Sequence, residues 1–316
     1  MLPLQLKKLY RKLYWLPKDL RWKIQLRGID ELVHFGDRGI GDDLLCTAVL
    51  HEMHKRGRAK VAMMTNWPEL FENLPSPAKV IPWDYGALHC IERAGIKTWR
   101  PTYAKVAEES PLRFSFAPGH LIEAMCRSVG IEGDVENRPH VWLTDTEKGK
   151  WSSLQQSLVV QTSRANPRFA LPNKEWYPAR WHKLGALLRK FTRVVQVGSK
   201  EDPLLEGADD LRGSTSLRDV AAILWNARLF LGLEGFLMHL ARAVDTRAVI
   251  IFGGYIHPSC SGYPENSNLF TELACSPCGY PVHCDFDREC MKRILPEDVL
   301  AAVVEAWEMP RLTKRA

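Results

Sequence analysis

The strongest candidate for acid–base chemistry is Asp42, which follows the glycine-rich turn Gly36-Asp37-Arg38-Gly39-Ile40-Gly41. Glycine lets a ligand approach the backbone closely, so Gly39 and Gly41 predict a ligand-facing loop. A carboxylate there can take a proton from a hydroxyl group within hydrogen-bond distance. The position is also typical of an aspartate that caps the following helix. The sequence leaves both interpretations open, and Asp43 could be confused with Asp42.

A second candidate, Lys174, lies in Asn173-Lys174-Glu175-Trp176-Tyr177-Pro178, just before a predicted helix. An ammonium group and the N–H groups at a helix start both stabilise the negative charge of a phosphate. Thr162 and Ser163 follow a predicted strand and can donate further hydrogen bonds to it. A solvated lysine at the start of a helix would show the same pattern.

Four cysteines form a possible metal motif with the spacing C-x2-C-x5-C-x5-C: Cys275, Cys278, Cys284 and Cys290. Thiolates at short spacing bind zinc or iron, and four of them close a tetrahedral shell around a structural ion. The x5 gaps differ from the usual zinc-finger spacing, so packing without a metal stays the alternative. A closed site of this kind would be structural, so we expect it to supply no cofactor for catalysis.

These residues need a scaffold, and the chain alternates between strand and helix patterns. In the first half we expect strands at 31–35, 59–65 and 80–83, helices at 42–56 and 120–129, and a long loop over 100–119. In the second half we expect strands at 157–161, 192–197, 229–233 and 248–252, and helices at 178–191, 216–226, 237–244 and 297–307. This rhythm predicts an α/β protein with two Rossmann-like parallel-sheet domains facing a cleft.

The polar stretch 132–150 suggests the boundary between these domains. We therefore expect an N-terminal domain over residues 1–150 and a C-terminal domain over residues 151–316, a length sufficient for two cores. In such folds the ligand lies beyond the carboxyl ends of the strands.

Positive charge is concentrated at the N-terminus. Residues 1–28 contain eight basic residues and one acid, whereas the rest of the chain has 35 basic and 36 acidic residues. Leucines recur at helical spacing beside these charges, which predicts either a segment that lies on an anionic membrane or a helix docked on its own domain. The chain has no signal-peptide or membrane-spanning pattern, so we expect a cytoplasmic protein, peripheral on the inner membrane. The near-neutral remainder argues against a nucleic-acid partner.

Several segments, in order, resemble glycosyltransferase family 9, the ADP-heptose:lipopolysaccharide heptosyltransferases. They are listed here: Gly41-Asp42-Asp43-Leu44-Leu45-Cys46-Thr47-Ala48, Lys174-Glu175-Trp176-Tyr177-Pro178, Leu211–Leu217, Gly232–Ala241, Phe252-Gly253-Gly254 and Cys275-Ser276-Pro277-Cys278. The resemblance spans about residues 33 to 304.

This resemblance implies a GT-B fold and an inverting, metal-independent transfer of a sugar, heptose first, from a nucleotide-diphosphate donor to an acceptor hydroxyl. The acceptor would be a glycan or a lipid-linked molecule in lipopolysaccharide or surface-glycan synthesis. The N-terminal domain would bind the acceptor, with Asp42 as general base, and the C-terminal domain the donor. Lys174 would contact the phosphate and Glu201 the ribose, although Glu201 also fits an exposed loop acid.

The segment Glu234-Gly235-Phe236-Leu237-Met238-His239 resembles the family's donor-binding sequence but departs from it. Glutamate replaces the usual aspartate, glycine the usual serine or threonine, and phenylalanine the usual glycine. We expect Glu234, Gly235, Phe236, Leu237 and His239 to contact the donor, although His239 equally fits a histidine hydrogen-bonded to backbone. The departures leave two alternatives open: a transferase with another donor that acts on protein or a modified DNA base, and a non-catalytic nucleotide-sugar-binding module.

Overall fold

The computed structural model describes residues 20–36, 39–163 and 171–315. The first half contains a four-stranded parallel sheet in the order β3-β2-β1-β4. Its elements are β1 (Glu31–His34), α2 (Ile40–Lys55), β2 (Val61–Thr65), η1 (Pro68–Phe71), β3 (Lys79–Pro82), α3 (Tyr85–Arg93), β4 (Lys97–Trp99) and α4 (Leu121–Ser128). The sequence patterns gave β1, β2, β3, α2 and α4 within a few residues but missed α3 and β4.

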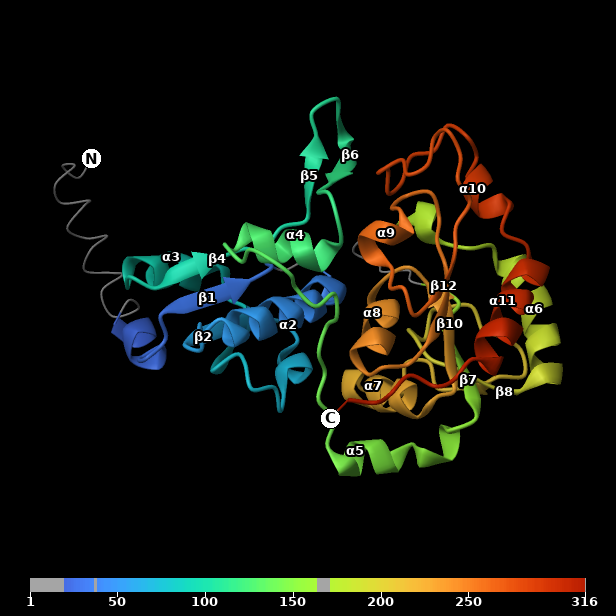
Figure 1. Ribbon diagram of the computed structural model, residues 1–316, viewed down its shortest axis with the longest axis horizontal. Helices are drawn as coiled ribbons and strands as arrows, with labels where there is room; N and C mark the ends of the chain where they lie inside the picture. Colours follow the sequence, from blue (N-terminus) through green and yellow to red (C-terminus); the bar gives the residue numbers. More distant parts are fainter. Residues whose placement is uncertain (1–19, 37–38, 164–170, 316) are drawn as a thin grey trace, which may run out of the picture.

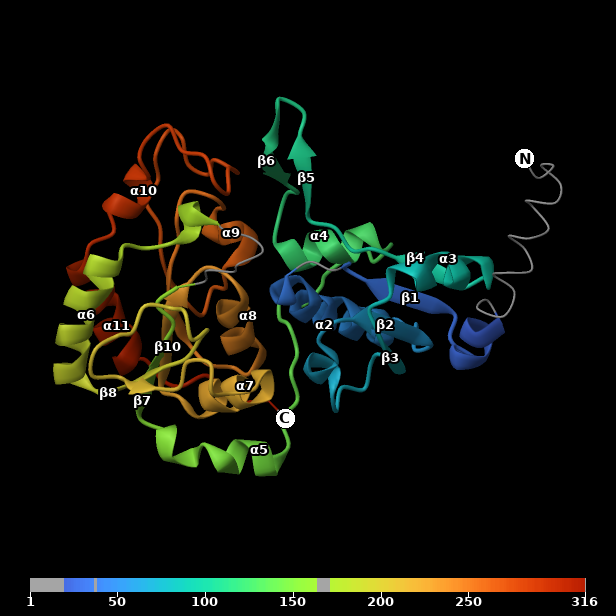
Figure 2. The ribbon, with the colours of Figure 1, turned by 180° about the vertical axis from the view of Figure 1, so that it is seen from behind.

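The sequence predicted a long loop over residues 100–119, and this prediction is wrong. The segment contains an antiparallel hairpin of β5 (Ala104–Ala107) and β6 (Ser110–Phe116). The hairpin stands beside the second half of the chain in Figures 1 and 2. Its strands show little alternation between buried and exposed residues, so they lack the period of two by which strands are recognised in a sequence.

The second half contains a six-stranded parallel sheet in the order β12-β11-β10-β7-β8-β9. Its strands are β7 (Ser157–Val160), β8 (Arg193–Gln196), β9 (Asp209–Asp210), β10 (Leu229–Leu233), β11 (Ala248–Ile251) and β12 (Ser267–Leu269). Its helical elements are η3 (Pro172–Lys174), α6 (Pro178–Phe191), α7 (Leu217–Asn226), α8 (Phe236–Ala243), α9 (Pro258–Ser261), α10 (Glu289–Lys292) and α11 (Pro296–Glu308). Strands β7, β10 and β11 are buried throughout, as parallel strands covered on both faces are.

The helices of the second half form two layers around its sheet. Helices α6 and α11 pack on one face, and α7 and α8 lie on the other. The connecting segment carries α5 (Asp145–Lys150) and η2 (Ser152–Leu154), which run beneath α7. Helix α2 of the first half and helix α8 of the second half pack against each other between the two sheets.

The two halves share one apolar core where α2 packs against α8. Val49 of α2 and Leu237 of α8 belong to the same buried cluster. A side chain on Gly41 would place its Cβ only 3.6 Å from the Cα of Phe236, so the starts of the two helices nearly touch. This contact brings the first turn of α2 next to the first turn of α8.

Residues 20–25 are helical, and this helix packs on the first half through Trp22 and Leu26, which are both buried. The docked-helix interpretation therefore holds for residues 20–28. The opposite side exposes Leu20 and Ile24 together with basic residues. The rest of the basic segment, residues 1–19, lies outside the described residues. No helix in the described part of the chain is long and apolar enough to cross a membrane.

Candidate active site

Both sheets have the strand order that creates a topological switch point, where the chain leaves neighbouring strands toward opposite faces. In the first sheet this point lies between β1 and β4, and in the second between β7 and β10. Ligands of open α/β sheets bind outside the carboxyl ends of the strands at such points. The switch points therefore indicate where functional side chains should be found.

Asp42 lies at the switch point of the first sheet. It is the third residue of α2, whose N-cap is Gly39 in an extended conformation without a side-chain capping bond. The expectation that Asp42 caps this helix is therefore wrong. Its Oδ1 accepts a hydrogen bond of 2.6 Å from the hydroxyl of Tyr103, which follows β4.

Asp43 occupies a different environment from its neighbour. Its side chain is buried and accepts a hydrogen bond from the Thr65 hydroxyl in the core. Burial raises the pKa of Asp43 to about 7, and the nearby charge of Asp42 raises it further, against the effect of the Thr65 hydrogen bond. Asp43 therefore belongs to the core of the first half.

Lys174 lies at the end of η3 and forms a buried ion pair with Glu234, the residue that follows β10. Its Nζ also lies 4.5 Å from the centre of the Tyr255 ring, a cation–π contact. The sequence predicted Lys174 and Glu234 as separate donor contacts. The structure brings them together and adds Tyr255, which sequence reasoning missed because its partners lie far away along the chain.

Helix α8 begins at this ion pair. Its N-cap, Gly235, has a φ of 154°, which favours glycine, and no side chain caps the helix. The first N–H groups of α8 thus have no side-chain cap, an arrangement that suits a phosphate. Phe236 is partly buried beside Gly41, and Leu237 is buried in the core.

His239 lies deeper, on the buried side of α8. Its Nδ1 is 2.7 Å from the hydroxyl of Tyr263, and its side chain is buried. The described contacts of His239 are those of a core residue behind the start of α8.

Thr162 and Ser163 follow β7, at the switch point of the second sheet, and both are buried. The Thr162 hydroxyl donates to the carbonyl of Pro203 and accepts from the Gln196 amide, so it holds the loops after β7 and β8 together. Glu201 lies in the loop after β8, fully exposed and hydrogen-bonded to Ser199. The structure does not bring Glu201 into contact with Lys174 or Glu234.

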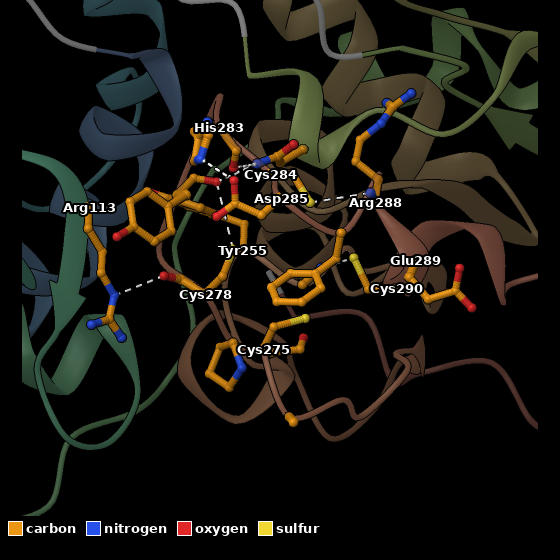
Figure 3. A pocket seen from close by; sticks show the side chains of 17 residues that line it. Arg113, Tyr255, Cys275, Cys278, His283, Cys284, Asp285, Arg288, Glu289 and Cys290 are labelled. Atoms are coloured by element: carbon orange, nitrogen blue, oxygen red, sulfur yellow. Dashed lines mark hydrogen bonds and ion pairs between the residues drawn. The ribbon is translucent and has the colours of Figure 1, made fainter. Parts of the chain in front are cut away.

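The four predicted metal-ligating cysteines line one pocket of about 260 Å³ beside the hairpin (Figure 3). The Sγ of Cys284 accepts from the backbone of Arg288, and that of Cys290 from the backbone of Gly254, both at 3.2 Å. Burial raises the pKa of Cys278 and of Cys290. No three of the four sulfur atoms lie within 4.8 Å of one another, so the loop would have to close around an ion.

A different cluster meets that distance within the described ranges: His51 of α2 with Glu136 and His140 of the connecting segment. Arg138, which can only donate, lies 3.2 Å from Nδ1 of His140, so Nδ1 accepts and the proton must sit on Nε2. A nitrogen that carries a proton cannot bind a cation. This contact therefore favours a structural cluster over a metal site.

The comparisons with known proteins fit this architecture. Residues 152–281 match the model of glycosyltransferase family 9 (heptosyltransferase). The resemblance to this family is confirmed over that segment. A search of curated proteins finds no significant match.

The solved structures that resemble the chain share its fold at low sequence identity. ADP-heptose lipopolysaccharide heptosyltransferase II of E. coli is 15% identical, with a TM-score of 0.64 over 88% of this chain and 98% of that one. A family 9 glycosyltransferase of Veillonella parvula is 14% identical, with a TM-score of 0.69 over 87% and 96%. The iron-containing dodecameric glycosyltransferase TibC of enterotoxigenic E. coli is 17% identical, with a TM-score of 0.64 over 88% and 77%. The predicted GT-B fold is confirmed.

Proposed function

We propose that the chain transfers a sugar from a nucleotide-diphosphate donor to an acceptor hydroxyl, with inversion at the sugar carbon, and that heptose is the first donor to test. The observation that carries this proposal is that functional residues at the switch points of the two sheets lie close together. Asp42 at the start of α2 and the Lys174–Glu234 pair at the start of α8 come from different halves, and the two helix starts nearly touch.

The donor's diphosphate fits the start of α8. The N–H groups of the first turn and the Lys174 ammonium supply the positive charge that a leaving phosphate requires. In this structure that ammonium is paired with Glu234, so the donor would have to share it or replace the carboxylate as its partner. A released Glu234 could accept hydrogen bonds from sugar hydroxyls.

The acceptor fits the side of Asp42. Its carboxylate takes the proton of the acceptor hydroxyl while that oxygen forms a bond to the anomeric carbon. The bond from this carbon to the donor's phosphate oxygen breaks, and the nucleoside diphosphate leaves with the electron pair. A single displacement of this kind inverts the configuration at the sugar carbon.

The identity of the donor rests on the relatives. TibC has been solved in complex with ADP-D-beta-D-heptose, and the E. coli neighbour is named an ADP-heptose heptosyltransferase. Glu234 and Phe236 differ from the family's usual aspartate and glycine, which favours a changed sugar as the second candidate. The acceptor would be a surface glycan, lipid-linked or carried on a protein, with residues 1–28 holding the enzyme at the inner membrane.

Calorimetric titration with ADP-heptose and with other ADP-, GDP- and UDP-sugars tests the proposal. We expect one of these sugars to bind, and Lys174→Ala to weaken that binding by roughly tenfold or more, because a charge-assisted contact is lost. Lys183→Ala, at an exposed lysine of α6, is the matched control and should bind normally. Equal affinities in all three proteins would contradict the role of Lys174.

The cysteine pocket is proposed as a structural metal site. The TibC relative is described as iron-containing. Four thiols in one pocket, two of them already accepting backbone N–H bonds, suit a zinc or iron ion. The ion would fix the loop through Cys275, Cys278, Cys284 and Cys290, and the transfer itself would be carried out by the protein's own side chains.

A further inference from the structure

Tyr103 contributes a side chain to the site that the sequence did not indicate. It follows β4, on the opposite side of the first sheet's switch point from Asp42, and its hydroxyl donates to Oδ1 of that aspartate at 2.6 Å. Its ring lies nearly parallel to that of Phe35 at the end of β1, with 5.9 Å between centroids and 20° between planes. The tyrosine therefore spans the switch point and ends on the carboxylate.

This hydrogen bond has two consequences for a general base. It holds the carboxylate in one rotamer through the bond to Oδ1. It also favours the ionised form, because a donated hydrogen bond stabilises a carboxylate. The hydroxyl itself stays protonated, since burial and the charge of Asp42 raise the pKa of Tyr103 well above its ordinary value.

Other titratable groups act on the same place. On α2 these are Asp43 and Cys46, and in the second half Glu234 and Tyr255 lie close enough to influence Tyr103. Lys174 compensates Glu234 through their ion pair. Burial and, in turn, the charge of Asp42 raise the pKa of Asp43, of Cys46 and of Tyr103.

The β5–β6 hairpin holds Tyr103 in position. The Tyr103 carbonyl accepts from the N–H of Ala117, which closes the base of the hairpin. Near the base of β6, the backbone N–H of Phe114 donates to the carbonyl of Gly279 at 2.9 Å, and the Arg113 guanidinium donates to the carbonyl of Cys278 at 3.0 Å (Figure 3). The hairpin is thus tied to the second half of the chain.

The same contact reaches the phosphate side of the site. Gly279 donates its N–H to the carbonyl of Tyr255, and the Tyr255 ring meets Phe116 of the hairpin edge to face, with 5.4 Å between centroids. Tyr255 in turn contacts the Lys174 ammonium. The hairpin therefore contacts both Tyr103, which is bonded to Asp42, and Tyr255, which contacts Lys174.

We propose that Tyr103 is a positioning residue for the base Asp42, held at the switch point by the bridge between the β5–β6 hairpin and the second half. This inference rests on the proposed function, since it assigns Asp42 the role of base. Tyr103 does not touch the reacting atoms and acts through Asp42.

The test is Tyr103→Phe, which removes the hydroxyl and keeps the ring. Carboxyl ¹³C NMR of aspartate-labelled protein, with the signal assigned by Asp42→Asn, follows the titration of Asp42 without any substrate. We expect its midpoint to rise by about one pH unit in Tyr103→Phe. Tyr85→Phe, at an exposed tyrosine of the same half, is the control and should leave the titration unchanged.

Turnover gives the second measurement. In Tyr103→Phe, kcat should fall about tenfold near neutral pH, because the base is no longer held in position, with an unchanged KM for the donor. The acid limb of the pH profile should move to higher pH together with the Asp42 midpoint. The proposal is overturned if Asp42 titrates at the same pH in Tyr103→Phe and in the unmodified protein. It is also overturned if the Asp42 titration shifts while kcat and its pH profile stay unchanged. If the unmodified protein turns over no nucleotide sugar, the proposed function fails, and with it the catalytic role of the contact, whatever the titration shows.

Discussion

At the scale of single residues, the site depends on the different environments of two neighbouring carboxylates. Asp42 and Asp43 are adjacent in the sequence, but one meets a tyrosine at a switch point and the other a threonine in the core. The sequence predicted Asp42 from its glycine turn. Tyr103 could not be found in this way, because a tyrosine in a stretch without periodicity carries no local sign of its partner.

The pKa of Asp43 has a consequence for stability. In the folded protein it is raised from an ordinary value of 3.8 to about 7, so the folded state holds a proton that the unfolded state has released. The contribution of Asp43 to the free energy of unfolding is fully present below about pH 4 and is lost as the pH rises to about 7. Asp43→Asn has no such titration.

We therefore expect the stability of Asp43→Asn, relative to the unmodified protein, to increase from pH 4.5 to pH 7.5. Urea unfolding of both proteins across this range measures the difference in free energy, in which other titrating groups cancel. A difference that stays constant with pH would show that Asp43 does not titrate in this range.

At the scale of elements, most strands of both sheets could be predicted because buried parallel strands are continuous apolar runs that end at glycine or polar residues. The short strands β4, β9 and β12 were missed because they are not such runs. Ser216 caps α7 with a full capping box. The β5–β6 hairpin was missed because a distant segment holds it: the loop around Gly279 lies more than a hundred residues away along the chain.

Gly279 makes this contact testable. Its φ is +70°, and a Cβ on it would lie 2.1 Å from the carbonyl oxygen of Phe114, so Gly279→Ala should push the hairpin away. We expect a loss of about 2–4 kcal/mol in unfolding free energy, from backbone strain and lost hydrogen bonds. Hydrogen exchange at the Phe114 amide should also become faster.

The matched control is Gly133→Ala. Gly133 has a φ of +80° but nothing within 4 Å of its Cβ position, so this variant has the backbone strain without the clash. Equal losses of stability in the two variants would mean that the bridge to the hairpin contributes nothing.

The cysteine pocket is the second testable element. Elemental analysis of protein purified without added metal should find about one zinc or iron ion per chain, as one closed tetrahedral site requires. Cys278→Ser should remove the ion and lower the melting temperature, since metal-binding free energy is folding free energy. Cys260→Ser, outside the pocket, should keep the ion and the melting temperature of the unmodified protein. A stable, metal-free protein would contradict the site.

At the scale of the whole molecule, the charge distribution suggests how the enzyme meets its acceptor. The helix at residues 20–25 is fixed to the first half by Trp22 and Leu26, so deleting the whole segment would open the core. Substitution of its exposed basic residues, Arg21, Lys23 and Arg27, by glutamine is the cleaner change.

This triple variant should bind vesicles with anionic lipid about a hundredfold more weakly, since each basic residue near the surface contributes about 1 kcal/mol. Added salt should weaken binding of the unmodified protein in the same direction. A control with Lys183, Lys190 and Arg193 changed to glutamine removes equal charge from the second half. Identical vesicle binding by both variants would refute a membrane surface at residues 20–28.

The division into two parallel-sheet units could be predicted from the sequence, because each half repeats the alternation of strands and helices. The way the halves meet could not, since it depends on the packing of α2 against α8 and on side chains distant along the chain. The Lys174–Glu234 pair illustrates this: each residue was predicted for its own chemistry, and only the fold joins them.

The central claim is sugar transfer with Asp42 as base, and release of nucleoside diphosphate from the nucleotide sugar that binds tests it most directly. A bacterial envelope extract supplies the acceptors. Asp42→Asn should bind the donor normally and release the diphosphate roughly a hundredfold to ten-thousandfold more slowly than the unmodified protein. Asp43→Asn, its neighbour in the core, should keep most of the activity. Release by Asp42→Asn at the rate of the unmodified protein would contradict the account.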